Sequence, residues 1–205
     1  MGKPPDFIKA RDYILARLEN ELSPHLIYHS PFHTLYEVVP AVERLATLEK
    51  VGEDDRLLLL TAAYYHDSGF IYQRQKHESI SIQLAGQSLP GFGYSDAQII
   101  VIQNIIQATC IPQSPANLLE QIMADSDLDY LGGEDFWERS NDLRGELENY
   151  GQQFSDNDWY VYQIQFMRSH QYFTASERSQ RDAPKNRFLQ EIERRLNKAI
   201  QGSST

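Results

Sequence analysis

Apolar residues recur along most of this chain at the three- and four-residue spacing of amphipathic helices. No stretch of any length shows the alternation and β-branched enrichment that are typical of strands. Caps and breakers divide the pattern into expected helices at about residues 6–22, 31–50, 53–68, 77–88, 95–108, 116–131, 135–150, 156–172 and 184–200. The sequence therefore predicts an all-α fold.

The predicted helices belong to one compact domain. The 205 residues lie within the size range that a single core usually serves, and no linker or internal repeat divides the chain. Residues 57–65, LLLLTAAYY, are apolar nearly all round and predict a buried central helix, with Gly69 as a natural C′ residue after it. The candidate motifs fall within about residues 28–132. We expect residues 133–200 to complete the same helical bundle.

Charge and cysteine content narrow the possible partners. Nineteen Lys and Arg residues against 29 Asp and Glu residues give a net charge of -10, which disfavours nucleic-acid polymers and anionic membranes as partners. Cys110 is the only cysteine, so neither an intramolecular disulfide nor a thiolate zinc site can form. No segment resembles a signal peptide or a membrane span. We therefore expect a cytoplasmic protein with no membrane association.

Two histidines flank the start of the second predicted helix. In the segment YHSPFHT, Ser30 is a good N-cap and Pro31 suits the first helical position. His29 then lies just outside the helix and His33 lies in its first turn, so both imidazoles can face one cavity. A helix N-terminus disfavours imidazolium, which leaves such a histidine available as a metal ligand. Capping or packing is the alternative role.

An ionisable pair, His66 and Asp67, ends the strongly apolar third helix. The C-terminal end of a helix dipole favours a cation at this place. The apolar residues before the pair favour burial, and a buried carboxylate without a partner would be costly. A solvated helix cap is the alternative role.

One carboxylate, Asp127, interrupts an apolar helix face and needs a compensating partner. Asp125 and Asp129 fall on a more mixed face, where we expect solvated surface roles. Two imidazoles and two carboxylates thus form one candidate metal-binding set: His33, His66, Asp67 and Asp127. This nitrogen and oxygen set suits Mn²⁺, Fe²⁺, Co²⁺, Ni²⁺, Zn²⁺ or Mg²⁺.

The order H, then HD, then D on a helical chain resembles the HD-domain superfamily of metal-dependent phosphohydrolases. The segments that carry the resemblance are YHSPFHTLYEVV, AAYYHDSGF, KHESIS, IIQATCIP and IMADSDLDYLG, within about residues 28–132. The resemblance implies an HD-type helical fold and four metal ligands, which are His33, His66, Asp67 and Asp127. It also assigns Asp125 to a paired-aspartate pattern that supports the ligands. The opening segment resembles cyclic nucleotide phosphodiesterases as well, which implies that His29 is the proton donor.

The chain departs from the two-metal members of that superfamily. Those proteins carry additional bridging histidines between the HD pair and the final aspartate, whereas this chain has only His77 there. We therefore expect a single divalent ion.

Several further residues are candidates for the same site. Arg74, Lys76 and His77 follow the HD helix and could neutralise phosphate oxygens, although a charged surface loop is the alternative. Thr109 is expected to line the pocket or to pack at a helix end. Glu78 is expected to hold a metal ligand in place or to occupy the favourable first turn of its helix.

The expected function is hydrolysis of a phosphate ester or anhydride of a small molecule, with a nucleotide as the expected substrate. A divalent ion would activate a water that Asp67 or Asp127 orients. Nucleotidase, pyrophosphohydrolase and phosphodiesterase activities are not separated by the sequence. A sensor that binds metal and nucleotide without turnover is the main alternative. A metal-free helical interaction protein is a third.

Overall fold

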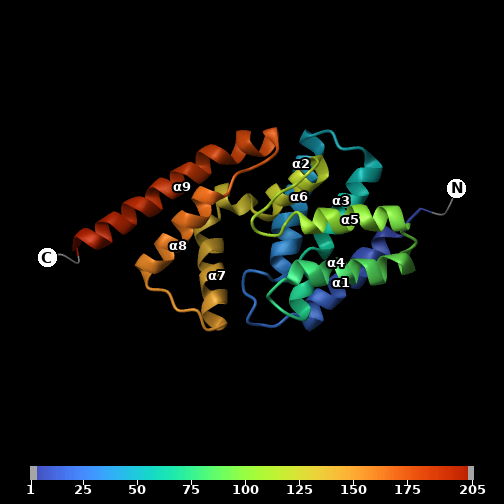
Figure 1. Ribbon diagram of the computed structural model, residues 1–205, viewed down its shortest axis with the longest axis horizontal. Coiled ribbons are helices and arrows are strands. Elements are labelled where there is room, and N and C mark those ends of the chain that lie inside the picture. The colour runs from blue at the N-terminus through green and yellow to red at the C-terminus, as the bar shows by residue number, and fades with distance from the viewer. Residues whose placement is uncertain (1–3, 203–205) are drawn as a thin grey trace.

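The computed structural model describes residues 4–202, and this part of the chain is helical without any strand (Figure 1). The expected all-α fold is therefore confirmed. The helices are α1 Phe7–Glu21, α2 Val39–Leu48, α3 Glu53–Tyr65, α4 His77–Ser88, α5 Asp96–Gln107, α6 Leu118–Asp127, α7 Phe136–Asn149, α8 Asp156–Ser169 and α9 Ala175–Gly202. A π-helix, His33–Val38, runs directly into α2. No described helix is long and apolar enough to cross a membrane.

Side-chain caps mark the starts of α1, α5 and α8. The Asp6 side chain accepts a hydrogen bond from the Lys9 amide at the start of α1. Reciprocal capping boxes begin α5 at Ser95 and α8 at Ser155. Such caps satisfy backbone N–H groups that the first turn of a helix leaves free, and they are readable in the sequence.

The last helix begins earlier than its sequence pattern suggested. We expected it from residue 184, but α9 starts at Ala175 and runs through Pro184. The Thr174 hydroxyl accepts a hydrogen bond from the Glu177 amide, so Thr174 acts as the cap. The segment Thr174–Glu177 has the T-x-x-E spacing of a capping box, and this signal outweighs the proline.

The apolar side chains form two clusters. The first surrounds α3 and draws on α1, α2, α4, α5 and α6, with Leu59, Ala62 and Ala63 completely buried. The second lies among α7, α8 and α9 and includes Tyr28, Leu128, Tyr130 and Leu131 from outside those helices. Figure 1 shows α7–α9 beside the bundle that α1–α6 form. The residues after Gly132 thus have an apolar cluster of their own, and Tyr28 links it to the first half of the chain.

Gly69 is required for close packing rather than for a left-handed backbone. It lies in the 3₁₀ turn Ser68–Ile71, and its φ is not positive, so it is not the C′ residue that we expected. A Cβ atom at this position would overlap the backbone of His77. The missing side chain therefore lets the turn after α3 contact the first residue of α4, which brings His77 close to Asp67.

His170 caps the end of α8 beside a buried lysine. Its Nδ1 lies 2.9 Å from Lys185 Nζ, and Lys185 also donates to the His170 carbonyl at 2.6 Å. Burial, with a smaller effect of the Lys185 charge, lowers the pKa of His170 from 6.5 to about 3. Below pH 6.5 the unfolded chain therefore binds a proton that the folded chain rejects, and stability falls as the pH falls toward 3.

Replacing His170 should make the free energy of unfolding depend less on pH below pH 7. In the presence of a chelator, which keeps any bound metal out of the comparison, the free energy of unfolding should fall between pH 7 and pH 5 by about 1 to 2 kcal/mol more in the wild type than in His170→Gln. Urea unfolding at both pH values measures the difference. The His25→Gln variant, which removes an exposed histidine, should behave as the wild type. Equal pH dependence in His170→Gln and the wild type would contradict the assignment.

Candidate metal centre

Three helix ends meet at the candidate metal centre. His33 begins the π-helix, and Asp127 is the last residue of α6. His66 and Asp67 directly follow α3. The four side chains that the sequence singled out as one set are thus brought together from helices far apart along the chain.

The ligand atoms of this set face one another. Asp127 Oδ1 lies 3.3 Å from His33 Nε2 and 3.4 Å from His66 Nε2. Asp67 Oδ2 lies 3.2 Å from His66 Nε2 and 3.9 Å from His33 Nε2. One ligand atom each of His33, His66 and Asp127 fall within 4.8 Å of one another. Small shifts of the side chains would place these atoms around one ion.

Two atoms of the centre are buried without a hydrogen-bond partner. They are His66 Nε2 and Asp67 Oδ2, and the His66 side chain is completely inaccessible to solvent. Buried polar atoms nearly always have a partner, so orphaned atoms that point at each other need an explanation. A divalent cation supplies one, because imidazole nitrogen and carboxylate oxygen are its usual ligands. The residues present therefore fit a divalent metal ion.

Contacts at Nδ1 hold the imidazoles of His33 and His66 in place. His33 Nδ1 lies 2.7 Å from Glu37 Oε2, one turn further along the π-helix. His66 Nδ1 lies 2.8 Å from the Ala63 carbonyl oxygen. A carboxylate or carbonyl on Nδ1 fixes the tautomer and points Nε2 toward a metal. Glu37 was not among the residues predicted for the site, although its position four residues after His33 was a usable signal.

The histidines and aspartates of the centre stabilise one another's charges. Burial disfavours charge on His33, but hydrogen bonds to Asp127 and Glu37 outweigh it and raise the pKa of His33 to about 9. For Asp127, burial is outweighed by His33 and His66, which lower the pKa of Asp127 to about 2. Without metal, protons on the imidazoles neutralise the carboxylates. A bound cation would take the place of those protons.

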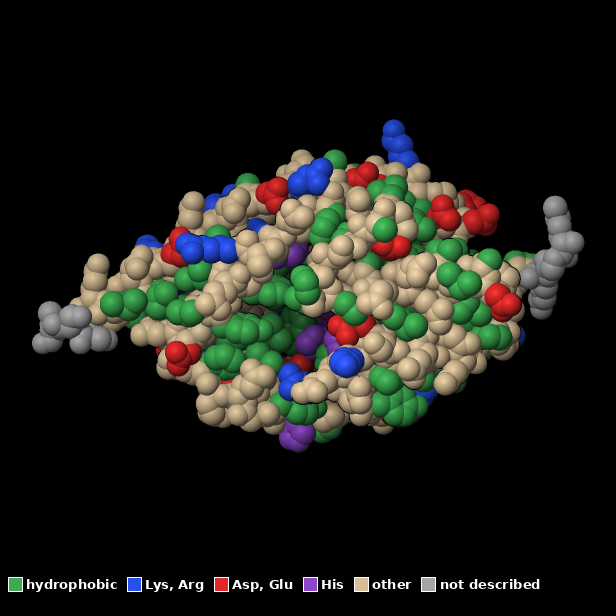
Figure 2. Space-filling model, in the orientation of Figure 1, with side chains coloured by type: hydrophobic (Ala, Val, Ile, Leu, Met, Phe, Trp, Pro, Cys, Tyr) green, Lys and Arg blue, Asp and Glu red, His purple; other side chains and the backbone are tan. Residues whose placement is uncertain are grey.

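A cavity of about 180 Å³ adjoins the centre. Figure 2 shows a hollow in which histidine side chains lie beside hydrophobic ones. Its lining consists of Tyr28, His29, Asp67, His77, Glu78, Thr109, Ile111, Asp127, Leu128, Tyr130, Leu143, Tyr162 and Phe166. The lining includes both aspartates of the candidate ligand set, so a molecule in the cavity would touch the candidate metal centre.

His29 lies at this cavity and is held by a buried carboxylate. Its Nδ1 is 2.6 Å from Glu146 Oε1, and Glu146 Oε2 accepts the backbone N–H groups of Tyr28 and His29, each at 2.9 Å. Burial would raise the pKa of Glu146, but His29 outweighs it and lowers that pKa. With Nδ1 engaged, Nε2 of His29 is the nitrogen left to act on a ligand. The sequence carried no signal for Glu146, which comes from α7.

The expected phosphate-binding residues take different positions. His77 lines the cavity, and its Nε2 lies 3.3 Å from Asp67 Oδ1. The Arg74 guanidinium lies over the Tyr150 ring at 4.2 Å, and the Lys76 side chain is exposed. Neither Arg74 nor Lys76 belongs to the residues that line the cavity. Of the three, only His77 is placed to touch a ligand there.

Thr109 and Glu78 both line the cavity. The Thr109 hydroxyl donates a hydrogen bond to the Ile106 carbonyl at 2.9 Å, so it also packs at the end of α5, as the alternative expectation had it. Glu78 lies in the first turn of α4, with Oε2 3.7 Å from His77 Nδ1. Glu78 is therefore part of the cavity wall, and its nearest charged neighbour is His77.

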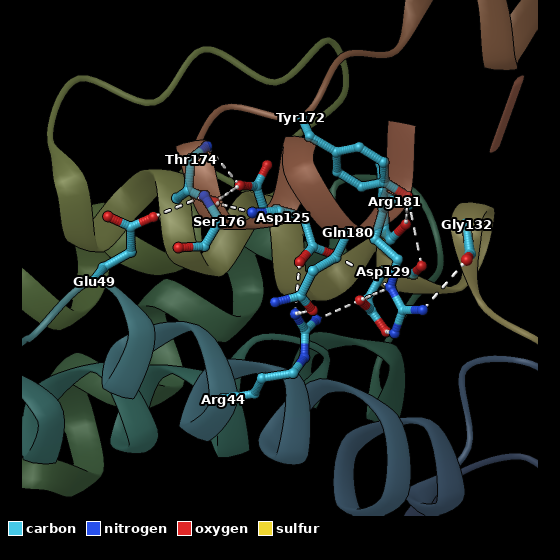
Figure 3. Close-up of polar contacts among 12 residues, drawn as sticks. Arg44, Glu49, Asp125, Asp129, Gly132, Tyr172, Thr174, Ser176, Gln180 and Arg181 are labelled. Atoms are coloured by element: carbon cyan, nitrogen blue, oxygen red, sulfur yellow. Dashed lines mark hydrogen bonds and ion pairs between the residues drawn. The ribbon is translucent and has the colours of Figure 1, made fainter. Parts of the chain in front are cut away.

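The expectation that Asp125 supports the metal ligands is wrong. Asp125 is completely buried and accepts hydrogen bonds from Phe173 N at 2.7 Å, Thr174 N at 2.8 Å and Thr174 Oγ1 at 2.7 Å. Figure 3 shows it directed at the start of α9. Asp125 therefore holds the N-terminus of α9, since its carboxylate replaces the missing backbone acceptors there.

Asp129 is not a solvated surface residue either. It pairs with Arg44 at 2.5 Å and with Arg181 at 2.7 Å (Figure 3). Glu177 on α9 adds a second carboxylate, 2.9 Å from Arg44. Burial, together with Asp129, raises the pKa of Glu177 to about 8. This cluster joins α2 to α9 and the turn after α6, and it lies outside the cavity.

No family model, curated protein or solved structure matches this chain. The interpretation of the centre rests on its own residues.

Proposed function

We propose that this protein is a metal-dependent phosphohydrolase with one divalent ion. The proposal is carried by one observation: the orphaned atoms His66 Nε2 and Asp67 Oδ2 face His33 and Asp127 at the floor of a cavity. The resemblance of the H, HD, D order to the HD-domain superfamily supplies the reaction class. A divalent ion in such a site polarises a phosphate oxygen and lowers the pKa of a water.

The residues at the cavity have separate roles in the proposed reaction. His33, His66 and Asp127 would hold the ion, and Asp67 would also orient the attacking water and accept its proton. The water oxygen forms a bond to phosphorus while the bond from phosphorus to the ester oxygen breaks. His29 Nε2 donates a proton to the leaving oxygen, and Glu146 keeps the ring oriented for that transfer. His77 can donate a hydrogen bond to a phosphate oxygen at the cavity wall.

The substrate is expected to be a small phosphorylated molecule in the cytoplasm. The net charge of -10 disfavours a nucleic-acid polymer, and the single cysteine fits a reducing compartment. Nucleotides are the first class to screen.

Metal analysis and a substrate screen test the proposal. The purified protein should bind about one equivalent of divalent metal, since two imidazoles and two carboxylates complete one coordination sphere. The metal-loaded protein should then hydrolyse members of a panel of nucleotides and simple phosphate esters assayed with Mn²⁺, Mg²⁺, Co²⁺ and Ni²⁺, and EDTA should abolish the activity.

Each other result has a distinct meaning. Two tightly held ions that both depend on His77 would contradict the single-ion site and move the favoured activity toward phosphodiester cleavage. Binding of metal and nucleotide without product would identify a sensor. A protein that binds no metal would overturn the proposal.

A further inference from the structure

The wall of the cavity away from the metal centre is apolar and aromatic. Tyr130 and Leu143 approach it from one side, and Tyr162 and Phe166 of α8 from another. In Figure 2 hydrophobic side chains line the hollow on the side away from the histidines. Tyr28 adds a ring that is 4% exposed, and its buried hydroxyl has no hydrogen-bond partner. Such a wall favours an apolar group.

The charges of the lining limit how many phosphate groups a ligand in the cavity can carry. Among the described residues that line the cavity none is Lys or Arg, and the carboxylate and imidazole side chains are those of Asp67, Glu78, Asp127, His29 and His77. A divalent ion would balance the two aspartates, which leaves one carboxylate and two imidazoles. Two imidazoles against one carboxylate give the lining at most one unit of positive charge beyond that balance. The roughly four charges of a triphosphate exceed this by far more than the two charges of one phosphate monoester do, and uncompensated charge in a confined site is costly.

The volume of the cavity also favours a ligand smaller than a nucleoside polyphosphate. Its volume of about 180 Å³ is below the roughly 300 to 1,000 Å³ of pockets that enclose drug-sized ligands. Building on the proposed phosphohydrolase function, we propose that the substrate is a monoester of a single phosphate with an apolar aliphatic or aromatic alcohol, rather than a nucleoside polyphosphate. The phosphate would lie at Asp67, Asp127 and His29, and the alcohol against the aromatic wall.

A series of alkyl phosphates tests this substrate class. Ethyl, butyl and hexyl phosphate have leaving alcohols of similar acidity, so differences in kcat/KM report binding of the chain. Each buried methylene contributes about 0.8 kcal/mol, or about fourfold. For the Mn²⁺-loaded protein, kcat/KM should therefore rise at least roughly tenfold from ethyl to hexyl phosphate, and hexyl phosphate should exceed ATP by a similar factor.

The aromatic wall can be removed without touching the metal centre. Tyr162→Ala should abolish most of the preference for hexyl over ethyl phosphate, so that the ratio of their kcat/KM values falls toward one. Tyr13→Ala is a matched control, because Tyr13 and Tyr162 are both 40% exposed and Tyr13 lies on α1 away from the cavity. Leu143→Ala is a second wall variant if Tyr162→Ala fails to fold, as circular dichroism would show.

The outcomes separate this inference from the proposed function. Hydrolysis with no effect of chain length, or with ATP as the better substrate, would overturn the inference and leave the phosphohydrolase function standing. If no ester is hydrolysed, the proposed function fails, and calorimetry with ethyl- and hexylphosphonate on the Mn²⁺-loaded protein decides the inference. Binding of hexylphosphonate at least roughly tenfold tighter supports the apolar wall as its site. Equal binding, or no binding, overturns it.

Discussion

The Asp67→Ala variant should hold no more than about a tenth of a metal equivalent and lose roughly 10³-fold or more in turnover. Both carboxylate oxygens of Asp67 face histidine side chains. Its Oδ2 faces His66 and its Oδ1 faces His77. Removing it takes away a ligand and the group that would orient the water, so binding and hydrolysis should be lost together. Metal analysis after gel filtration and an ester assay measure the two effects.

A carboxylate elsewhere on the chain provides the control. The Asp12 side chain is 58% exposed and pairs with Arg11 on α1, so Asp12→Ala should keep metal and activity. Asp67→Asn preserves the shape of the side chain and should also lose turnover, which guards against an effect of misfolding. Full metal occupancy in Asp67→Ala, with a native circular dichroism spectrum, would count strongly against Asp67 as a ligand.

The sequence predicted the centre because its residues sit at helix ends that are locally marked. Ser30 and Pro31 mark the start of the helix that carries His33, and the apolar run of α3 ends at His66. Asp127 stood out because it interrupts an apolar face. These signals are short-range in sequence, and the packing of α2, α3 and α6 then brings the three helix ends together.

The residues that the sequence did not reveal depend on contacts between distant segments. Glu146 is separated from His29 by 117 residues, and no periodicity within α7 indicates the partner. Asp125 and Asp129 were predicted to face solvent because their side of the predicted helix is mixed, but the segment that begins α9 binds Asp125 and Arg181 of α9 binds Asp129. A helical pattern gives the polarity of a face and does not say which basic or N–H groups another helix will bring to it.

Substituting His29 by Gln should leave metal binding intact and lower turnover by about 10² to 10⁴. Its imidazole lies at the cavity, and Glu146 engages the nitrogen that does not face the ligand. The loss should be largest for esters with poor leaving groups, because these need a proton on the departing oxygen, and smaller for activated aryl phosphates. Turnover of hexyl phosphate and p-nitrophenyl phosphate, measured on the same metal-loaded samples, checks this pattern.

The role of Glu146 as a positioning residue has its own readout. Glu146→Gln should lower turnover less than His29→Gln, because an amide oxygen can still accept a hydrogen bond from Nδ1 of His29 although it carries no charge. In the double variant the two losses should not add, since Glu146 acts through His29. His25→Gln, which alters an exposed histidine outside the cavity, should retain full activity. Loss of metal from His29→Gln would make His29 a ligand, and undiminished turnover would leave it only a structural contact to Glu146.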